Sequence, residues 1–311
     1  MKHGLLALDK GHPGQMDLLE AHFDIIRPRA PDPERIIAEN AQNVRAITTY
    51  LNPVQRNLME MLPNLEIIAC GAVGIDHIDL DAAQERGIAV THTPDVLTND
   101  TADTGIMLMM NILRRGVEAD MYVRAGMWKN GAMPLGRTLG GKKVGIVGLG
   151  RIGRAFATRA RAFGMEISYF GPSKKDDVVY QYYDDLEAMA TDVDVLALTC
   201  MGGVRTKGLV NYSVLQALGK TGFLVNIARG SVVNQNDLLM ALSNKVIAGV
   251  GLDVYDDEPN VPESLFIRDD VVLLPHIGSA TVETRTKMGR IVAGNLLAHF
   301  AGEPLLTPVE M

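Results

Sequence analysis

A glycine-rich segment at residues 143–153, Lys-Val-Gly-Ile-Val-Gly-Leu-Gly-Arg-Ile-Gly, constrains the fold more than any other stretch of this chain. Its apolar first half is typical of a β-strand, and a helical pattern at Arg154–Ala162 follows the last glycine at once. Glycines at these spacings permit a tight turn, a close approach of the backbone to a ligand, and close packing of helix on strand. The helix N-terminus then offers free N–H groups to phosphates. The segment therefore predicts a dinucleotide-binding turn formed by Gly148, Gly150, Arg151, Ile152 and Gly153.

Length and composition narrow the class of protein. The 311 residues are too many for one ordinary α/β core and suit two domains. The net charge of −7 disfavours nucleic-acid binding. No apolar run is long enough to cross a bilayer, and the stretch Leu5–Leu8 is too short for a signal peptide. We therefore expect no membrane association. Cys70 and Cys200 end separate predicted strands, so we expect no disulfide and a cytoplasmic location.

Strand-like and helix-like segments alternate along the chain, which predicts parallel sheets covered by helices. In the first hundred residues, the predicted strands are Gly4–Leu8, Phe23–Ile26, Val44–Tyr50, Leu65–Cys70 and Ile88–Thr91. The predicted helices between them are Gln15–Ala21, Glu34–Glu39, Val54–Met61 and Leu80–Arg86. A long apolar helix, Asp100–Leu113, follows, with Thr98 to Asp100 supplying its N-cap.

A second βαβ series begins at Lys143 and predicts a six-stranded dinucleotide-binding sheet. Its strands are Val144–Gly148, Met165–Phe170, Val193–Leu198, Phe223–Ile227, Ile247–Val254 and Val271–Leu274. One more helix, Val282–Phe300, is expected to pack back on the N-terminal sheet. The fold class is thus α/β with two doubly wound parallel-sheet domains: a Rossmann-type coenzyme domain at 99–280 and a discontinuous, flavodoxin-like substrate-binding domain at 1–98 and 281–311. We expect the ligand cleft between the domains.

The residues after the second strand of this sheet bear on the choice of dinucleotide. In such sheets an acidic residue about 20 positions beyond the glycine turn usually binds the ribose hydroxyls. Here the strand is followed by Ser173, Lys174 and Lys175, and no carboxylate occurs before Asp176. A hydroxyl and two ammonium groups suit a 2′-phosphate, so NADPH is predicted in preference to NADH. The alternative is that both lysines form an ordinary solvated loop with loose selectivity.

Three further strand ends carry residue types that suit reduction of a 2-keto acid. They place Arg229, Glu258 and His276 at the ligand-facing edge of the second sheet. A guanidinium can bind a carboxylate and polarise a ketone, and a histidine can protonate the oxygen as hydride reaches the carbon. Taken singly, each side chain could equally be a polar loop residue, but together they favour catalysis. No metal site is expected.

With these residues in view, the chain resembles the D-isomer-specific 2-hydroxyacid dehydrogenase family over nearly its whole length. The resemblance rests on motifs in order along the chain: Ala72–Asp79, Thr93–Thr98, Gly140–Gly153, Asn226–Gly230, Gly251–Pro259 and Pro275–Thr281. Within the family, Pro134–Arg137 and Phe163–Phe170 are similar to NADPH-dependent glyoxylate/hydroxypyruvate reductases and their 2-ketogluconate-reducing relatives. One departure follows Thr199 and Cys200, where Met201-Gly202-Gly203 replaces the usual Pro-Leu-Thr.

The resemblance implies a role for each site residue. His276 would be the general acid–base, Glu258 would stabilise its imidazolium, and Arg229 would bind the substrate carboxylate and keto oxygen. Backbone N–H groups of Val73 and Gly74 would bind the other side of that carboxylate, with His276 also contacting substrate. The remaining implied cofactor contacts are Asp253 on the nicotinamide amide and Thr199, Cys200, Ile227, Ala228 and Gly278 around the cofactor. The resemblance also implies a homodimer formed through residues near 100–126.

The leading hypothesis is an NADPH-dependent reductase that converts small 2-keto acids, such as glyoxylate and hydroxypyruvate, to D-2-hydroxy acids. A longer substrate such as 2-ketogluconate is the alternative within the same chemistry. A hypothesis of another class is a dinucleotide-sensing binding protein, because transcriptional corepressors also resemble this family. The complete set of Arg229, Glu258 and His276 counts against that last reading.

Overall fold

The computed structural model describes residues 2–28 and 32–311, and the chain divides into two compact units. Unit 1 comprises Met1–Leu97 and Ser279–Met311, and unit 2 comprises Thr98–Gly278. The predicted boundaries, 1–98 with 281–311 and 99–280, lie within two residues of these limits. Among the described residues, no helix combines the length and the apolar content that a membrane span requires.

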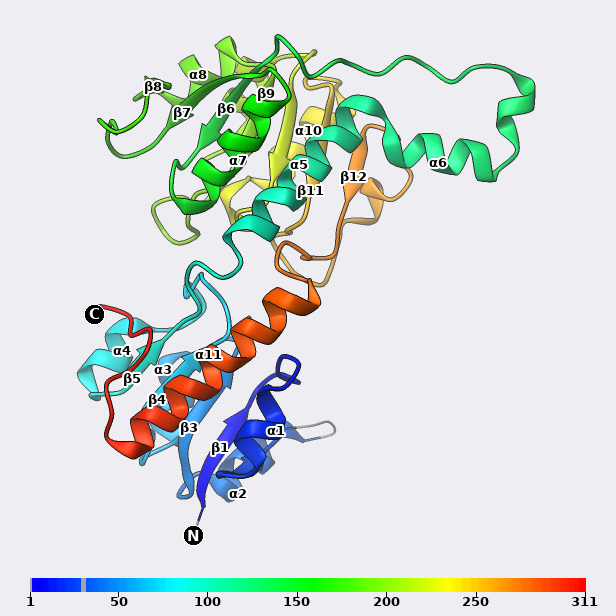
Figure 1. Ribbon diagram of the computed structural model, residues 1–311. Coiled ribbons are helices and arrows are strands. Elements are labelled where there is room, and N and C mark those ends of the chain that lie inside the picture. The colour runs from blue at the N-terminus through cyan, green and yellow to red at the C-terminus, as the bar shows by residue number, and fades with distance from the viewer. Residues whose placement is uncertain (1, 29–31) are drawn as a thin grey trace. The chain divides into compact units, whose positions relative to one another are not determined.

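Unit 1 is built on a five-stranded parallel sheet in the order β2-β1-β3-β4-β5 (Figure 1). Its strands are β1 (His3–Ala7), β2 (Phe23–Ile26), β3 (Val44–Thr49), β4 (Ile67–Cys70) and β5 (Ala89–Thr91). Its helices are α1 (Gln15–Glu20), α2 (Pro33–Asn40), α3 (Arg56–Met61), α4 (Leu80–Glu85) and α11 (Val282–Ala301). The strand order 2-1-3-4-5 is that of flavodoxin-like sheets, as the predicted fold class requires.

Helices cover both faces of this sheet because the strand side chains alternate between two apolar layers. On one face, Leu6 and Ile47 pack with residues of α3 and α4. On the other, Leu5 and Ala46 pack with α1 and with Val292 of α11. Each fully buried leucine stabilises the fold by about 1.5–3 kcal/mol. The last helix therefore belongs with the first strands, although the whole of unit 2, Thr98–Gly278, lies between the two parts of unit 1 in the chain.

Unit 2 contains a seven-stranded parallel sheet in the order β12-β11-β10-β9-β6-β7-β8. Its strands are β6 (Lys143–Val147), β7 (Glu166–Phe170), β8 (Gln181–Tyr183), β9 (Val195–Leu198), β10 (Phe223–Asn226), β11 (Gly249–Leu252) and β12 (Val271–Leu273). Counted from β6, this is the order 3-2-1-4-5-6 of dinucleotide-binding sheets with one strand added beyond β11. Ligands in such sheets bind at the carboxyl ends of the strands, where the order reverses beside β6.

Two sets of helices sandwich this second sheet (Figure 1). In all, unit 2 contains the helices α5 (Thr98–Arg114), α6 (Gly116–Arg124), α7 (Arg151–Ala162), α8 (Leu186–Asp192), α9 (Tyr212–Leu218) and α10 (Gln235–Ser243), with 3₁₀ turns η1 (Met127–Asn130), η2 (Gly230–Val232) and η3 (Glu263–Leu265), and α6 is not part of the sandwich. Helices α5 and α7 form one apolar layer with β6, β9 and β10. Helices α8, α9 and α10 cover the opposite face.

Three details of unit 2 differ from the prediction. The sheet has a seventh strand, β8, which is three residues long, lies at the sheet edge and pairs only with β7. Its sequence, Gln-Tyr-Tyr, carries no apolar run that would mark a strand. Helix α5 begins at Thr98 itself, so the residues from Thr98 to Asp100 form its first turn instead of its N-cap. Helix α6 was not predicted, because it buries no residue in the chain and so shows no apolar stripe.

Candidate functional site

The turn between β6 and α7 needs its glycines for backbone geometry and for space. Gly148 has φ +92°, and a Cβ there would lie 2.6 Å from the Cα atom of Cys200. A Cβ on Gly153 would overlap the carbonyl oxygen of Gly148. At Gly150, by contrast, no heavy atom lies within 4 Å of the Cβ position. The turn is therefore tightly packed at Gly148 and Gly153, and it is open at Gly150.

The residues of this turn fit the phosphates of a dinucleotide. Helix α7 begins after Gly150 without any side-chain cap, so its first backbone N–H groups remain available to a ligand. The Thr199 hydroxyl donates to the Gly148 carbonyl at 2.7 Å and ties the end of β9 to the turn. Burial raises the pKa of the neighbouring Cys200 thiol to about 11, so this thiol is protonated at neutral pH and is no nucleophile.

The loop after β7, which carries Ser173, Lys174 and Lys175, is fixed by contacts at both ends. The Tyr182 hydroxyl donates to the Gly171 carbonyl at 3.1 Å, and the Lys175 backbone N–H donates to the Tyr169 hydroxyl at 2.6 Å. Ser173 and Lys174 are exposed, while Lys175 is half-buried. The second acid after the lysines, Asp177, pairs with Arg154 of α7 at 2.9 Å.

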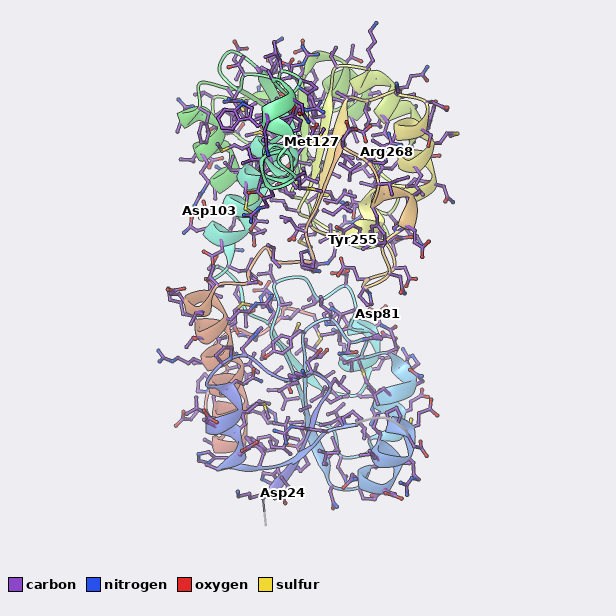
Figure 2. The ribbon with its side chains drawn as sticks, turned by 90° about the vertical axis from the view of Figure 1, so that its right-hand side faces the viewer. Asp24, Asp81, Asp103, Met127, Tyr255 and Arg268 are labelled. Atoms are coloured by element: carbon purple, nitrogen blue, oxygen red, sulfur yellow. The ribbon has the colours of Figure 1, made fainter. Side chains whose placement is uncertain are left out.

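Three adjacent strands end in register at the same edge of the sheet. Asn226 of β10 is paired with Leu252 of β11, which in turn is paired with Leu273 of β12. The segments that leave these strands carry Arg229, Glu258 and His276, respectively. Tyr255, labelled in Figure 2, lies three residues beyond the end of β11 at Leu252 and three residues before Glu258.

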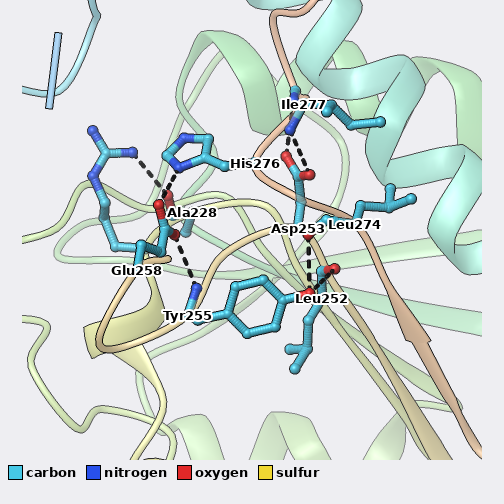
Figure 3. A network of polar contacts seen from close by, with 10 residues as sticks. Ala228, Leu252, Asp253, Tyr255, Glu258, Leu274, His276 and Ile277 are labelled. Carbon is cyan, nitrogen blue, oxygen red and sulfur yellow. Dashed lines mark hydrogen bonds and ion pairs between the residues drawn. The ribbon is translucent and has the colours of Figure 1, made fainter. Parts of the chain in front are cut away.

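Two of the three predicted catalytic side chains, Glu258 and His276, meet at this edge (Figure 3), and Arg229 is near enough for its charge to act on Glu258. The Nδ1 atom of His276 lies 2.6 Å from Oε2 of Glu258, and both side chains are about a quarter exposed. The other carboxylate oxygen of Glu258 accepts the Tyr255 backbone N–H at 3.0 Å. Arg229 Nη1 donates to the carbonyl of Ala228 at 3.0 Å. Because Nδ1 is bound to Glu258, Nε2 is the ring nitrogen that can act on a substrate.

The charge state of Glu258 follows from its neighbours. Burial alone would raise its pKa, but the hydrogen bond and charge of His276, the Tyr255 N–H and the charge of Arg229 lower the pKa below its ordinary value. Glu258 is therefore a carboxylate at neutral pH. The charge of Glu258 therefore lies directly against the Nδ1 side of the imidazole.

Asp253 leaves the end of β11 and turns inward. Its carboxylate accepts the backbone N–H groups of Ile277 at 2.7 Å and Gly278 at 2.8 Å. Burial raises its pKa, against the opposing effects of these two N–H groups and of His276. The contacts of Asp253 with the His276 turn, and those of Tyr255 with Glu258, were missed in the sequence. The only available signal was a polar side chain placed directly after a buried strand.

The predicted site residues are distributed over both units. Unit 2 contains all of them except Val73 and Gly74, which follow β4 in unit 1. In unit 1 the carbonyl of Val73 lies 3.1 Å from Nδ1 of His92. Ile227 and Ala228 are buried where β10 ends, and the Ala228 N–H donates to the Asn226 side chain at 3.0 Å. The roles of these residues toward substrate and cofactor remain predictions.

Known proteins share the sequence and the fold of this chain. Residues 106–278 match the family described as "D-isomer specific 2-hydroxyacid dehydrogenase, NAD binding domain". The chain is 46% identical to a hydroxyphenylpyruvate reductase of Plectranthus scutellarioides over 94% of either chain. It is 48% identical to a 2-ketogluconate reductase of Gluconobacter oxydans over 87% of this chain and 89% of that one.

The fold is equally close to that of a crystal structure of an NADPH-dependent glyoxylate/hydroxypyruvate reductase from Sinorhizobium meliloti in complex with NADP and malonate. The TM-score is 0.93 at 41% identity, over 99% of this chain and 97% of the other. The predicted family, fold class and enzyme class are confirmed by these matches, as is a nicotinamide dinucleotide as cofactor. The chain belongs to the D-isomer specific 2-hydroxyacid dehydrogenase family and is an oxidoreductase of that family.

Proposed function

We propose that this enzyme is an NADPH-dependent reductase of small 2-keto acids, such as glyoxylate and hydroxypyruvate, and that it forms D-2-hydroxy acids. The observation that carries the proposal is the 2.6 Å contact between His276 and Glu258, beside Arg229 at the carboxyl edge of the unit 2 sheet. The names of the relatives, which include reductases of glyoxylate, hydroxypyruvate and 2-ketogluconate, support this substrate class.

The proposed roles follow from the donors at this edge. The nicotinamide cofactor supplies the hydride that adds to the carbonyl carbon of the substrate. The Arg229 guanidinium binds the substrate carboxylate with two parallel hydrogen bonds and polarises the ketone. His276 gives the proton on Nε2 to the oxygen and is left as a neutral ring whose Nδ1–H still donates to Glu258. We assign Val73 and Gly74 of unit 1 to the substrate carboxylate.

The preference for NADPH rests on the loop after β7. Ser173 and Lys174 are exposed on a loop that is held at both ends, so their hydroxyl and ammonium groups can bind a 2′-phosphate. The Asp177 carboxylate is paired with Arg154, which reduces the repulsion that it would exert on that phosphate. The NADPH dependence printed for the Sinorhizobium meliloti reductase supports the same assignment.

We also propose that the enzyme is cytoplasmic and that it is a homodimer. Helix α6 projects away from the unit 2 sheet and carries exposed apolar side chains that include Met121 and Val123 (Figure 1). The 3₁₀ turn η1, which follows α6, adds the exposed side chains of Met127, labelled in Figure 2, and Trp128. Apolar side chains gathered on one projecting element favour a surface that a second subunit covers.

Substrate class is tested with a panel of 2-keto acids. We expect purified enzyme to oxidise NADPH with glyoxylate and hydroxypyruvate, and chiral analysis of the hydroxypyruvate product to give the D-isomer. 2-Ketogluconate and hydroxyphenylpyruvate extend the panel, and a higher kcat/KM for either of them would move the assignment to that longer substrate. No NADPH oxidation with any acid of the panel would contradict the proposal and favour the dinucleotide-binding alternative.

Cofactor preference is tested by removing both ammonium groups. The variant Lys174→Ala/Lys175→Ala should lose about tenfold or more in kcat/KM for NADPH, because a charged hydrogen bond contributes about 1.5–3 kcal/mol. Its kcat/KM for NADH should stay within about threefold of the wild type, since NADH lacks the 2′-phosphate. Lys220→Ala, an exposed lysine just before the amino end of β10, is the matched control. A wild type that prefers NADH, or an equal loss with both cofactors, would refute the assignment.

The role of Glu258 is tested with Glu258→Gln, which keeps the size of the side chain and removes its charge. We expect kcat for reduction to fall about tenfold or more, since proton transfer contributes about 10²–10⁴-fold to such rates. Glu263→Gln, on the exposed turn η3, is the control. A kcat of Glu258→Gln within about twofold of the wild type would show that catalysis does not depend on the contact between Glu258 and His276.

A further inference from the structure

The backbone of the residue that carries the proposed acid is in a conformation that side chains rarely adopt. His276 has φ +54°, which is the left-handed region. A non-glycine residue stays there only when its surroundings hold it, and such residues cluster at functional sites. Of the described non-glycine residues with positive φ, His276 is the one that belongs to the predicted site.

Three hydrogen bonds of this turn go to one residue, Asp253 (Figure 3). The backbone carbonyl of Asp253 accepts the N–H of His276 at 2.9 Å. Its carboxylate accepts the next two N–H groups along the chain, from Ile277 at 2.7 Å and from Gly278 at 2.8 Å. Three successive N–H groups of the turn therefore bind to one aspartate at the end of β11.

The fit around this carboxylate is close. Asp253 is 2% exposed. A Cβ on Gly278 would lie 3.2 Å from the Asp253 carboxylate and 3.3 Å from Thr101 of α5. At Gly278 the turn therefore packs closely against both the Asp253 carboxylate and Thr101 of α5. Buried N–H groups that lost this acceptor would be left unsatisfied, so the turn would have to move to regain partners.

We propose that Asp253 is a positioning residue for catalysis, whose carboxylate fixes the 276–278 turn and so sets the His276 ring against Glu258. The proposal rests on the proposed role of His276 as the acid, and it is separate from any contact between Asp253 and the nicotinamide amide. Each carboxylate oxygen binds one N–H of the turn, so the carboxylate has to accept at both oxygens for the turn to keep its shape. The ring and its partner carboxylate are 2.6 Å apart, a distance that a small movement of the turn would change.

The variant Asp253→Asn tests this proposal because it is close in shape and differs in hydrogen bonding. Its amide has one acceptor oxygen, and its NH₂ group would face the N–H of either Ile277 or Gly278. We expect kcat at saturating NADPH to fall about tenfold or more, because small misplacements of catalytic groups are costly. The dissociation constant of NADP⁺, measured by calorimetry, should stay within about threefold of the wild type, since the phosphate-binding turn is untouched.

The matched control is Asp256→Asn, which removes a carboxylate from an exposed position three residues further along the same segment. It should leave kcat and NADP⁺ affinity unchanged. NADP⁺ binding and the thermal transition report whether Asp253→Asn is folded. A kcat within about twofold of the wild type would overturn the proposal. So would a loss confined to NADP⁺ affinity with kcat restored at saturation, because Asp253 would then serve cofactor binding alone.

A double-mutant cycle separates this proposal from the proposed function. If Asp253 acts through His276, Asp253→Asn should change the residual rate by less than about twofold when His276 is already glutamine. A full loss in that background would overturn the positioning role and leave the acid assignment intact. An unchanged rate in the single variant His276→Gln would overturn the acid assignment, and the positioning proposal with it.

Discussion

The hydrogen bond between Nδ1 of His276 and Glu258, 2.6 Å long, is the interaction on which the catalytic geometry depends. It joins two loops that follow neighbouring strands, and it occupies one ring nitrogen so that the other can serve a substrate. The surroundings keep Glu258 ionised, since His276, the Tyr255 N–H and Arg229 together outweigh the effect of burial on its pKa. A partly buried pair of this kind is stronger than the same pair would be in water. The hydrogen bond thereby fixes the position of the His276 ring.

The topology of the unit 2 sheet explains why this pair lies on the same edge as the dinucleotide turn. All seven strands are parallel, so the loops that follow β6, β10, β11 and β12 leave from their carboxyl ends. The glycine turn after β6 offers backbone N–H groups, and the loops after the other three strands offer charged side chains. An acidic chain of net charge −7 can thus bind an anionic cofactor through local donors, without a basic surface.

Much of this arrangement could be predicted from the sequence, because each prediction rested on a local pattern. The glycine spacing identified the turn at Gly148–Gly153, and apolar runs identified the longer strands. The sheet of unit 2 still has one strand more than predicted, since β8 consists of polar and aromatic residues at an edge. Helix α6 escaped prediction for a related reason, as it contributes no buried face within the chain.

The finer structure of the site could not be predicted, because it depends on contacts between segments far apart in the chain. The left-handed backbone of His276 has no sequence signal, since histidine rarely adopts this conformation. Nothing in the sequence indicates that the carboxylate of Asp253 accepts hydrogen bonds from Ile277 and Gly278, 24 and 25 residues further along. Tyr255 shows the same limit: its hydroxyl donates to Leu274 at 2.9 Å across two strand ends.

The most direct test of the central claim is the rate of NADPH oxidation in a single turnover with His276→Gln, measured beside the affinity of the same variant for NADP⁺. Glutamine cannot supply a proton, so the rate should fall by about 10²-fold or more while cofactor affinity is retained. A single-turnover rate close to that of the wild type would contradict the claim that His276, paired with Glu258, protonates the substrate.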